Sequence, residues 1–362
     1  NGRMNERESF LDKLRAAATC AVVMLHTVTG VMDNTDMNLY PFEKKVFLVA
    51  LDLICWCVPV FLIISGYLFL TPRREIGAAK MLTKYCRRIL LALFGFGVPY
   101  ACLEQAAVTG GLRWDMPGRA FLMVLRGQSW SHLWYLYLIL FLYLLTPALR
   151  WILFRVPVRA VWAVLGILLA GCSILPYLAR LLGREDIPVL PDGCIYLFYY
   201  ISGYLFAVKK EKLREKAADG ARGGRVAGTG RGCRERAGGR CLPVLTVLLG
   251  LGMACSRLSG SYTLQMAYNY PFTVLLALML FAGGIRGGTG GRIFWKQASE
   301  LSFAVYLIHP LFLNLAYKFF HVTPLSFPIG ISLPLFFAAV LALSAGCAWL
   351  LRKIPPLRKY VL

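Results

Sequence analysis

The sequence has few acidic residues and none of the short motifs of common soluble enzymes. Its 18 Asp and Glu residues are outnumbered by 40 Lys and Arg residues, which gives a formal net charge of +22. There is no GxGxxG segment opening a βαβ unit, no Walker A loop and no GxSxG elbow. The eleven cysteines are scattered without zinc-ligand spacing. These absences argue against dinucleotide-binding enzymes, P-loop NTPases and α/β-hydrolases, and we expect no metal site, no disulfide framework and no tightly bound cofactor.

Long apolar segments dominate what is present. Hydrophobic residues make up 58% of the chain, more than a soluble domain contains, and they gather in blocks of about 20 residues, long enough to cross a bilayer as helices. The blocks lie at residues 13–33, 46–70, 89–108, 133–153, 158–177, 190–208, 242–257, 270–285, 299–320 and 327–351. We therefore expect an all-α, polytopic integral membrane protein with about ten transmembrane helices in a single domain, residues 1–362. The first apolar run is membrane-length and precedes no small-residue cleavage site, so we expect no cleaved signal peptide.

The positive charges fall on one side of the predicted membrane. The termini and the loops after even-numbered blocks hold 31 of the 40 Lys and Arg residues, whereas the loops after odd-numbered blocks hold 8. The positive-inside rule then places both termini in the cytoplasm. Topology and anionic lipid headgroups explain the excess charge, so no nucleic-acid partner is needed. The Gly- and Arg-rich segment 209–240 lacks the apolar residues of a core, and we expect a flexible cytoplasmic loop there.

The first predicted helix carries ionisable residues inside an apolar run. Arg15 lies near its start and His26 lies eleven residues later. Eleven steps of about 100° place both side chains on one helix face, about 16 Å apart along the axis. Charged residues within spanning segments usually face a bundle interior and mark a pathway or a site. The alternative is a histidine that hydrogen-bonds a neighbouring helix and serves packing only.

Two further features lie near the predicted cytoplasmic ends of helices. The second block ends in VPVFLIISGYLFL, in which Ser65 and Tyr67 supply hydroxyl groups; small residues at such a break also serve helix packing. The tripeptide SGY occurs again in YYISGYLFAVKK. The loop after the second block contains Lys84, Arg87 and Arg88, here called the 84–88 cluster. Its residues lie within one helical turn and suit phosphate groups, although a solvated loop that sets topology has the same composition.

Two later segments contain further histidines and aromatic residues. His132 and Trp134 lie at the outer boundary of the fourth block, where an interfacial aromatic belt also places such residues. In ELSFAVYLIHPLFL, Tyr306 and His309 are three residues apart and share a face. Pro310 removes a backbone donor next to His309. All four polar residues are candidates for lining a site, and a chain of protonatable groups also fits a transporter.

Six sequence blocks resemble the membrane-bound acyltransferase-3 family. FLDKLRAAATCAVVMLH resembles its opening, an arginine, ten intervening residues and a histidine, matched here by Arg15 and His26. The later blocks follow in the family's order: VPVFLIISGYLFL, KYCRRILLALFGFGVPY, HLWYLYLILFLYLLTP, YLFYYISGYLFA and LSFAVYLIHPLFL. The resemblance covers nearly the whole chain. The long 209–240 loop and the lack of an appended soluble domain depart from some members, and argue against a fused esterase-like domain and a membrane serine racemase.

The resemblance implies a membrane O-acyltransferase of the bacterial-type cytoplasmic membrane. Such an enzyme moves an acyl group, often acetyl, from cytoplasmic acyl-CoA to a hydroxyl of an extracytoplasmic or lipid-linked glycan. Under this assignment, Arg15 and the 84–88 cluster hold the phosphates of the acyl-CoA co-substrate. His26 serves as general base or forms an acyl-His intermediate. Asp12, one turn before Arg15, orients that arginine.

Two other classes of function stay open at this stage. A transporter or flippase would use His26, His132 and His309 as a proton relay, and would move its substrate without consuming acyl-CoA. A racemase-type membrane component would bind its substrate without catalysis. In all three cases membrane lipid is a partner.

Overall fold

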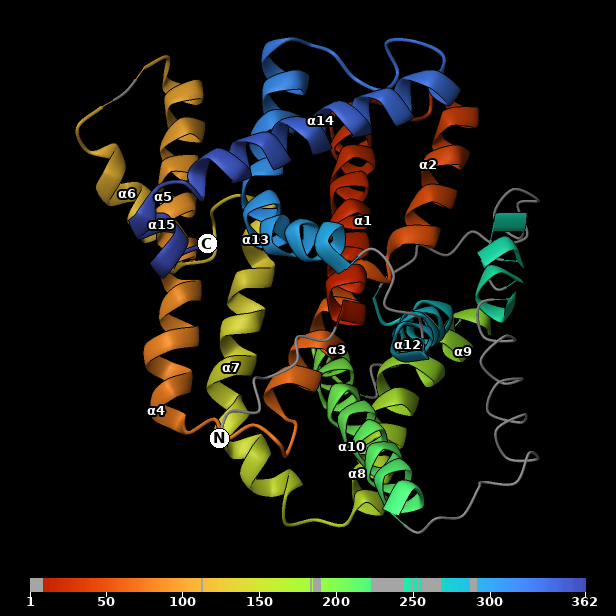
Figure 1. Ribbon diagram of the computed structural model, residues 1–362. Helices are drawn as coiled ribbons and strands as arrows, with labels where there is room; N and C mark the ends of the chain where they lie inside the picture. Colours follow the sequence, from red (N-terminus) through yellow and green to blue (C-terminus); the bar gives the residue numbers. More distant parts are fainter. Residues whose placement is uncertain are drawn as a thin grey trace.

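The chain is described by a computed structural model over residues 9–111, 113–182, 184, 190–222, 244–248, 250–252, 254–255, 268–286 and 292–362. All regular structure in these residues is helical (Figure 1). The α-helices are α1 (Ser9–Asn34), α2 (Pro41–Ile54), α3 (Cys57–Phe69), α4 (Ala78–Lys80), α5 (Arg87–Thr109), α6 (Met116–Leu125), α7 (Trp134–Leu153), α8 (Val158–Leu169), α9 (Leu175–Leu181), α10 (Cys194–Arg222), α12 (Pro271–Arg286), α13 (Arg292–Asn314), α14 (Ile329–Leu351) and α15 (Pro355–Tyr360). Short π-helical segments precede α5 and α9 and follow α13.

Seven helical segments are long and apolar enough to cross a membrane, in the part of the chain that the structure describes. They cover Ser9–Asn34, Pro41–Phe69, Ala78–Thr109, Ser131–Leu153, Val158–Arg180, Ile293–Phe319 and Ile329–Leu351, and each overlaps one predicted block. Of the other three blocks, 190–208 lies mostly in α10, 270–285 coincides with the shorter apolar helix α12, and 242–257 lies partly outside the described residues. The all-α, multi-span prediction is confirmed at this level, and the count of ten stays a prediction.

Helix α1 lies inside the bundle and packs against α3 on one side and α13 on the other (Figure 1). Its apolar residues Leu14, Val23 and Val28 are buried. At its far end, the Tyr317 hydroxyl donates a hydrogen bond to the Thr27 carbonyl at 2.7 Å. Helix α1 is therefore held between two other helices.

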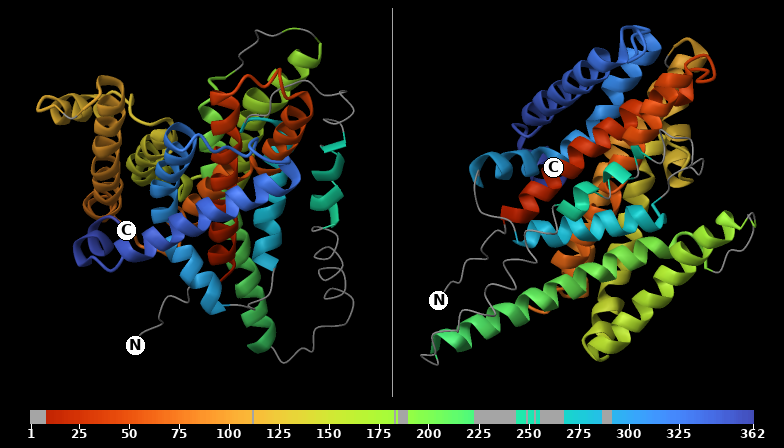
Figure 2. Two further views of the ribbon diagram at one scale, coloured as in Figure 1. Left: turned by 90° about the horizontal axis from the view of Figure 1, so that it is seen from above. Right: turned by 90° about the vertical axis from the view of Figure 1, so that its right-hand side faces the viewer.

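Helices α3 and α10 pack directly on each other (Figure 1). The two SGY tripeptides lie at this contact. A Cβ atom added at Gly66 would come within 1.8 Å of the Tyr200 carbonyl oxygen. One added at Gly203 would come within 2.3 Å of the Tyr67 backbone nitrogen. The two glycines thus allow the backbones to touch, as small residues do in membrane helix pairs. Helix α10 also packs against α8 (Figure 2).

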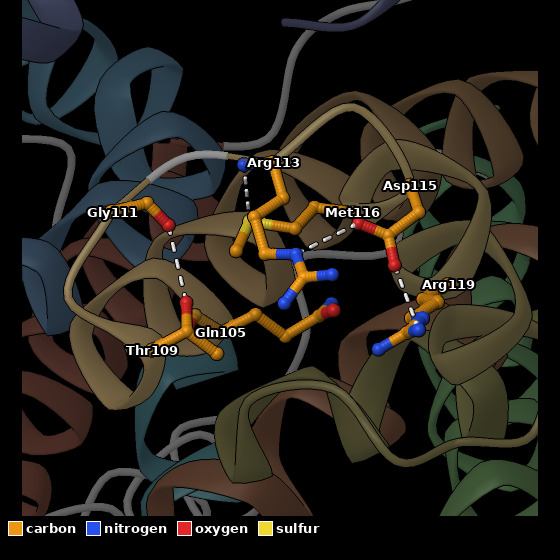
Figure 3. Close-up of polar contacts among 7 residues, drawn as sticks. All are labelled: Gln105, Thr109, Gly111, Arg113, Asp115, Met116 and Arg119. Atoms are coloured by element: carbon orange, nitrogen blue, oxygen red, sulfur yellow. Dashed lines mark hydrogen bonds and ion pairs between the residues drawn. The ribbon is translucent and has the colours of Figure 1, made fainter.

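Helices α5 and α6 form one edge of the molecule and lead into the segment before α7 (Figure 2). The turn before α6 is closed by Asp115, which pairs with Arg113 at 3.4 Å and with Arg119 at 2.7 Å (Figure 3). After α6, the Ser129 hydroxyl donates to the Gly97 carbonyl of α5 at 3.1 Å. These contacts fix the chain just ahead of His132, which belongs to a 3₁₀ turn at the start of α7.

Candidate active site

A cavity of about 1290 Å³ opens between α1, α3, α7 and α13. Of the residues predicted from the sequence, nine line it: Asp12, Arg15, His26, Ser65, Tyr67, Arg88, His132, Trp134 and Tyr306. The remaining three, Lys84, Arg87 and His309, do not. Residues from α1, near the start of the chain, and from α13, near its end, thus line the same cavity. Helical periodicity alone does not predict this contact between distant segments.

The candidate residues of α1 line one cavity. Arg15 and His26 both line the large cavity, as does the buried Asp12. The shared face predicted from their eleven-residue spacing is therefore confirmed. The neighbouring apolar side chains of α1, such as Val23, are fully buried against other helices. The polar residues of this spanning helix thus avoid lipid, as their cost in hydrocarbon requires.

One end of the cavity is rich in arginine. Arg73, Arg74, Arg88 and Arg352 line it together with Arg15, and this group is called the arginine mouth. Several of these side chains already have partners within the protein. Arg73 pairs with Glu211 at 2.9 Å and Arg352 with Glu300 at 3.2 Å, and Arg88 donates to the carbonyls of residues 361 and 362. The mouth still gathers several guanidinium groups, which suit phosphate oxygens.

The 84–88 cluster does not act as one unit in this structure. Lys84 and Arg87 are exposed and lie outside the cavity, and only Arg88 reaches it. Arg87 instead lies over the Tyr360 ring at 5.6 Å. The arginine mouth takes most of its members from the 71–74 loop and the C-terminal segment. Sequence reasoning missed Arg352, because its charge looked like any other in a basic tail.

Arg150, near the end of α7, fixes the loop that carries Arg73 and Arg74. It is a buried guanidinium that donates to the carbonyls of Phe69 at 2.7 Å, Thr71 at 3.1 Å and Arg74 at 2.5 Å. The last carbonyls of a helix lack intrahelical donors and carry its negative dipole end. Arg150 satisfies them at the end of α3 and thereby fixes the start of the following loop.

Hydroxyl groups line the middle of the cavity. Ser65 of the first SGY tripeptide lies near Tyr135 and Tyr143, two residues of α7, and interacts with both. All three line the cavity with Tyr306. The first SGY tripeptide therefore has both of the roles considered for it, helix packing and lining of the site. Its glycine packs against α10, and its serine lines the cavity.

Three histidines meet at the inner end of the cavity. The His26 ring centroid lies 5.2 Å from that of His309 and 6.4 Å from that of His132, and the last two are 6.0 Å apart. His132 and His309 are buried, so His132 does not belong to a lipid-facing aromatic belt. The Tyr306 hydroxyl donates to the His132 carbonyl at 2.6 Å and so ties α13 to the turn before α7. In the described residues, no cluster of three His, Cys, Asp or Glu residues could hold a metal ion.

A second cavity, of about 320 Å³, begins on the other side of these histidines. His26 and His132 line both cavities, which makes them the wall between the two. The second lining is strongly polar: Thr29, Asp33, Asn34, Glu104, Gln128, Ser129, Ser131, Asn314 and Lys318. It also contains Trp130, whose ring stacks on Tyr100 at 4.2 Å. No sequence pattern pointed to these residues, because four separate segments contribute them.

The comparisons with known proteins agree with the resemblance carried by the sequence blocks. A family model described as an acyltransferase domain, that of the acyltransferase-3 family, matches residues 8–353. No curated protein and no solved structure matches the chain. The family model and the apolar helices together support a multi-pass membrane enzyme that transfers acyl groups. The chain belongs to the acyltransferase-3 family.

Proposed function

We propose that the protein transfers an acetyl or similar acyl group from acyl-CoA in the large cavity to a sugar hydroxyl in the second cavity. The observation that carries this proposal is that His26 lines both cavities. A single imidazole at their junction can reach both a thioester that enters from one side and an alcohol that enters from the other. A general base needs such access to the proton that it removes.

Two features support binding of the acyl donor in the large cavity: its arginine residues and the separation of Arg15 from His26 along α1. The arginine mouth offers guanidinium groups to the phosphates of CoA, and Arg15 lies on the same helix face as His26, about 16 Å away along the axis. The phosphates would stay among the arginines while the flexible arm carries the thioester inward. The hydroxyls of Ser65, Tyr135 and Tyr143 line this route. The 31-to-8 distribution of basic residues supports a cytoplasmic position for the mouth.

The acceptor side is supported by the chemistry of the second cavity. Carboxylates such as Asp33 and amides such as Gln128 bind the hydroxyl groups of a polyol. Trp130 offers an aromatic ring for the apolar face of a sugar. The topology that places the mouth in the cytoplasm places this cavity toward the outside, where a surface or lipid-linked glycan of a bacterial-type membrane would enter.

The reaction balances with His26 alone as the proton carrier. His26 takes the hydroxyl proton as the acceptor oxygen attacks the thioester carbonyl, which forms the new C–O bond. Collapse of the tetrahedral intermediate breaks the C–S bond, and the imidazolium returns the proton to the departing CoA thiolate. A covalent acyl-His intermediate is the second route to the same products.

The test uses the full-length protein, purified and reconstituted in lipid nanodiscs. Radiolabelled acetyl-CoA is supplied with candidate glycans, and His26→Ala is compared with His321→Ala, which alters the exposed fourth histidine. We expect His26→Ala to lose about 10²–10⁴-fold in transfer rate while it still binds acetyl-CoA. His321→Ala should match the wild type. Transfer at the wild-type rate by folded His26→Ala would refute the catalytic role, and a wild type that moves glycan without consuming acyl-CoA would favour a transporter.

A further inference from the structure

His309 lies behind His26 rather than in either cavity. It is fully buried in α13, and it is absent from the linings of both spaces. Its ring lies 5.2 Å from that of His26 and 6.0 Å from that of His132, the two histidines that line both cavities. The proposed reaction leaves this buried titratable group without a role.

The local helix chemistry fixes which His309 nitrogen carries the proton. Pro310 lacks the backbone N–H that would bond the Tyr306 carbonyl, so this part of α13 has a spare acceptor. The His309 Nδ1 atom lies 3.0 Å from the Val305 carbonyl oxygen and also interacts with the Tyr306 carbonyl. A carbonyl only accepts hydrogen bonds, so Nδ1 must carry the hydrogen. In the neutral ring, Nε2 is then a bare acceptor.

That bare acceptor has no hydrogen-bond partner among the described residues, although it is buried. The nearest histidine ring is that of His26, at 5.2 Å between centroids and 35° between planes. Two imidazoles joined end to end by an N–H···N bond of about 2.9 Å have a similar centroid separation. Hydrogen bonds between catalytic groups are often poorly aligned without substrate and tighten in the complex. The final torsion of a histidine ring is soft, so a rotation of the His26 ring brings one of its nitrogens toward His309 Nε2.

We propose that His309 is a positioning residue that accepts a hydrogen bond from His26 and orients its other nitrogen toward the acceptor hydroxyl. This role rests on the proposed function of His26. The backbone carbonyls hold Nδ1–H, Nε2 accepts the proton-bearing nitrogen of His26, and the remaining His26 nitrogen is left bare to act as base. His309 takes the place that a carboxylate fills in a Ser-His-Asp triad, but without adding a negative charge to the interior.

The proton count stays balanced through the cycle. His26 begins with one proton, directed at His309, and gains a second from the acceptor hydroxyl. The resulting imidazolium donates to His309 Nε2 throughout, and this charge-assisted bond is stronger than the neutral one that preceded it. The second proton leaves with the CoA thiolate, and both histidines return to their starting state. The His309 bond therefore strengthens when charge develops on His26, which is the condition for accelerating the chemical step.

The experiment compares His309→Gln with His309→Phe in the reconstituted full-length protein. The amide oxygen of glutamine can reach the position of Nε2 and accept the same hydrogen bond, whereas phenylalanine fills the space without an acceptor. We expect His309→Phe to lower kcat about 10–100-fold, the contribution of one hydrogen bond to a charged group. The KM values for acyl-CoA and acceptor should not change, and His309→Gln should recover most of the rate. His321→Gln is the matched control, because it changes an exposed histidine in the same way.

Two results would overturn the proposal. If His309→Phe is folded, binds acyl-CoA and keeps the wild-type kcat, His309 does not position the base. If the glutamine and phenylalanine variants are equally impaired, the residue serves packing alone. Failure of the proposed function looks different, because the wild type itself would then neither bind acyl-CoA nor transfer an acyl group.

Discussion

Arg150 offers a sharp test of the donor site because it binds no substrate in the proposed reaction. Its guanidinium makes three hydrogen bonds to the backbone at the end of α3 and in the following loop. Two of the arginines in the mouth, Arg73 and Arg74, belong to that loop. In Arg150→Gln, the positive charge is lost and the shorter amide cannot reach all three carbonyls. The loop then becomes ordered only when donor binds, which reduces affinity.

The size of the effect follows from the bonds that are lost. A hydrogen bond to a charged group contributes about 1.5–3 kcal/mol, and each 1.36 kcal/mol corresponds to about a tenfold change. Loss of one such contribution from donor binding predicts a rise of about 10–100-fold in the KM for acyl-CoA. The kcat at saturating donor should change little, because Arg150 lines neither cavity. Lysine, with a single donor group in place of the planar fork, should recover only part of the affinity.

The assay measures initial rates of acyl transfer against acyl-CoA concentration, with direct binding of acyl-CoA as a second readout. Arg155→Gln is the control, because Arg155 is an exposed arginine on the same segment that packs over the Trp151 ring at 4.4 Å. An unchanged KM in folded Arg150→Gln would show that the 71–74 loop does not hold the donor. A fall in kcat with no change in KM would instead assign Arg150 to the chemical step.

Two further mutational results follow from the structure. Arg74→Gln should raise the KM for acyl-CoA several-fold, whereas Lys84→Gln should leave it unchanged, because Arg74 lines the cavity and Lys84 does not. Initial rates measured against acyl-CoA concentration test this. Equal effects of the two substitutions would favour the 84–88 cluster as a donor site. Gly66→Ala should prevent stable folding, since its Cβ would lie within 1.8 Å of a backbone oxygen, whereas Gly95→Ala meets nothing within 4 Å and should keep the wild-type elution profile in detergent. A well-folded Gly66→Ala protein would disprove the close contact of α3 and α10.

Local periodicity predicted that the two residues on α1 line one cavity. Arg15 and His26 face the same cavity because eleven residues are almost a whole number of helical turns. Tyr306 and His309 illustrate the limit of that reasoning. Their three-residue spacing does place them on neighbouring positions, but Tyr306 lines the cavity while His309 lies behind it. A shared face does not decide which side chain reaches the open space.

Contacts between distant segments could not be predicted from spacing. Arg352 reaches the mouth from after α14, and Arg150 of α7 bonds the backbone of the loop that carries Arg73 and Arg74. Both looked like ordinary cytoplasmic charges, because a count of basic residues measures topology rather than position. The same limit applied to Lys84 and Arg87, whose neighbours in sequence suggested a phosphate site although their exposed side chains do not line the cavity.

The repeated SGY tripeptide shows how one short pattern takes on different roles in two helices. Each glycine is required where the backbones of α3 and α10 touch, so both copies share that packing role. The serines diverge because the helices face different surroundings. Ser65 lines the cavity beside Tyr135 and Tyr143, whereas the Ser202 hydroxyl donates back to the Phe198 carbonyl of its own helix at 2.8 Å. Only the α3 copy of the tripeptide lines the cavity. Substitution of Ser65 therefore changes the lining of the proposed donor route, whereas substitution of Ser202 changes α10, the helix that packs against α3.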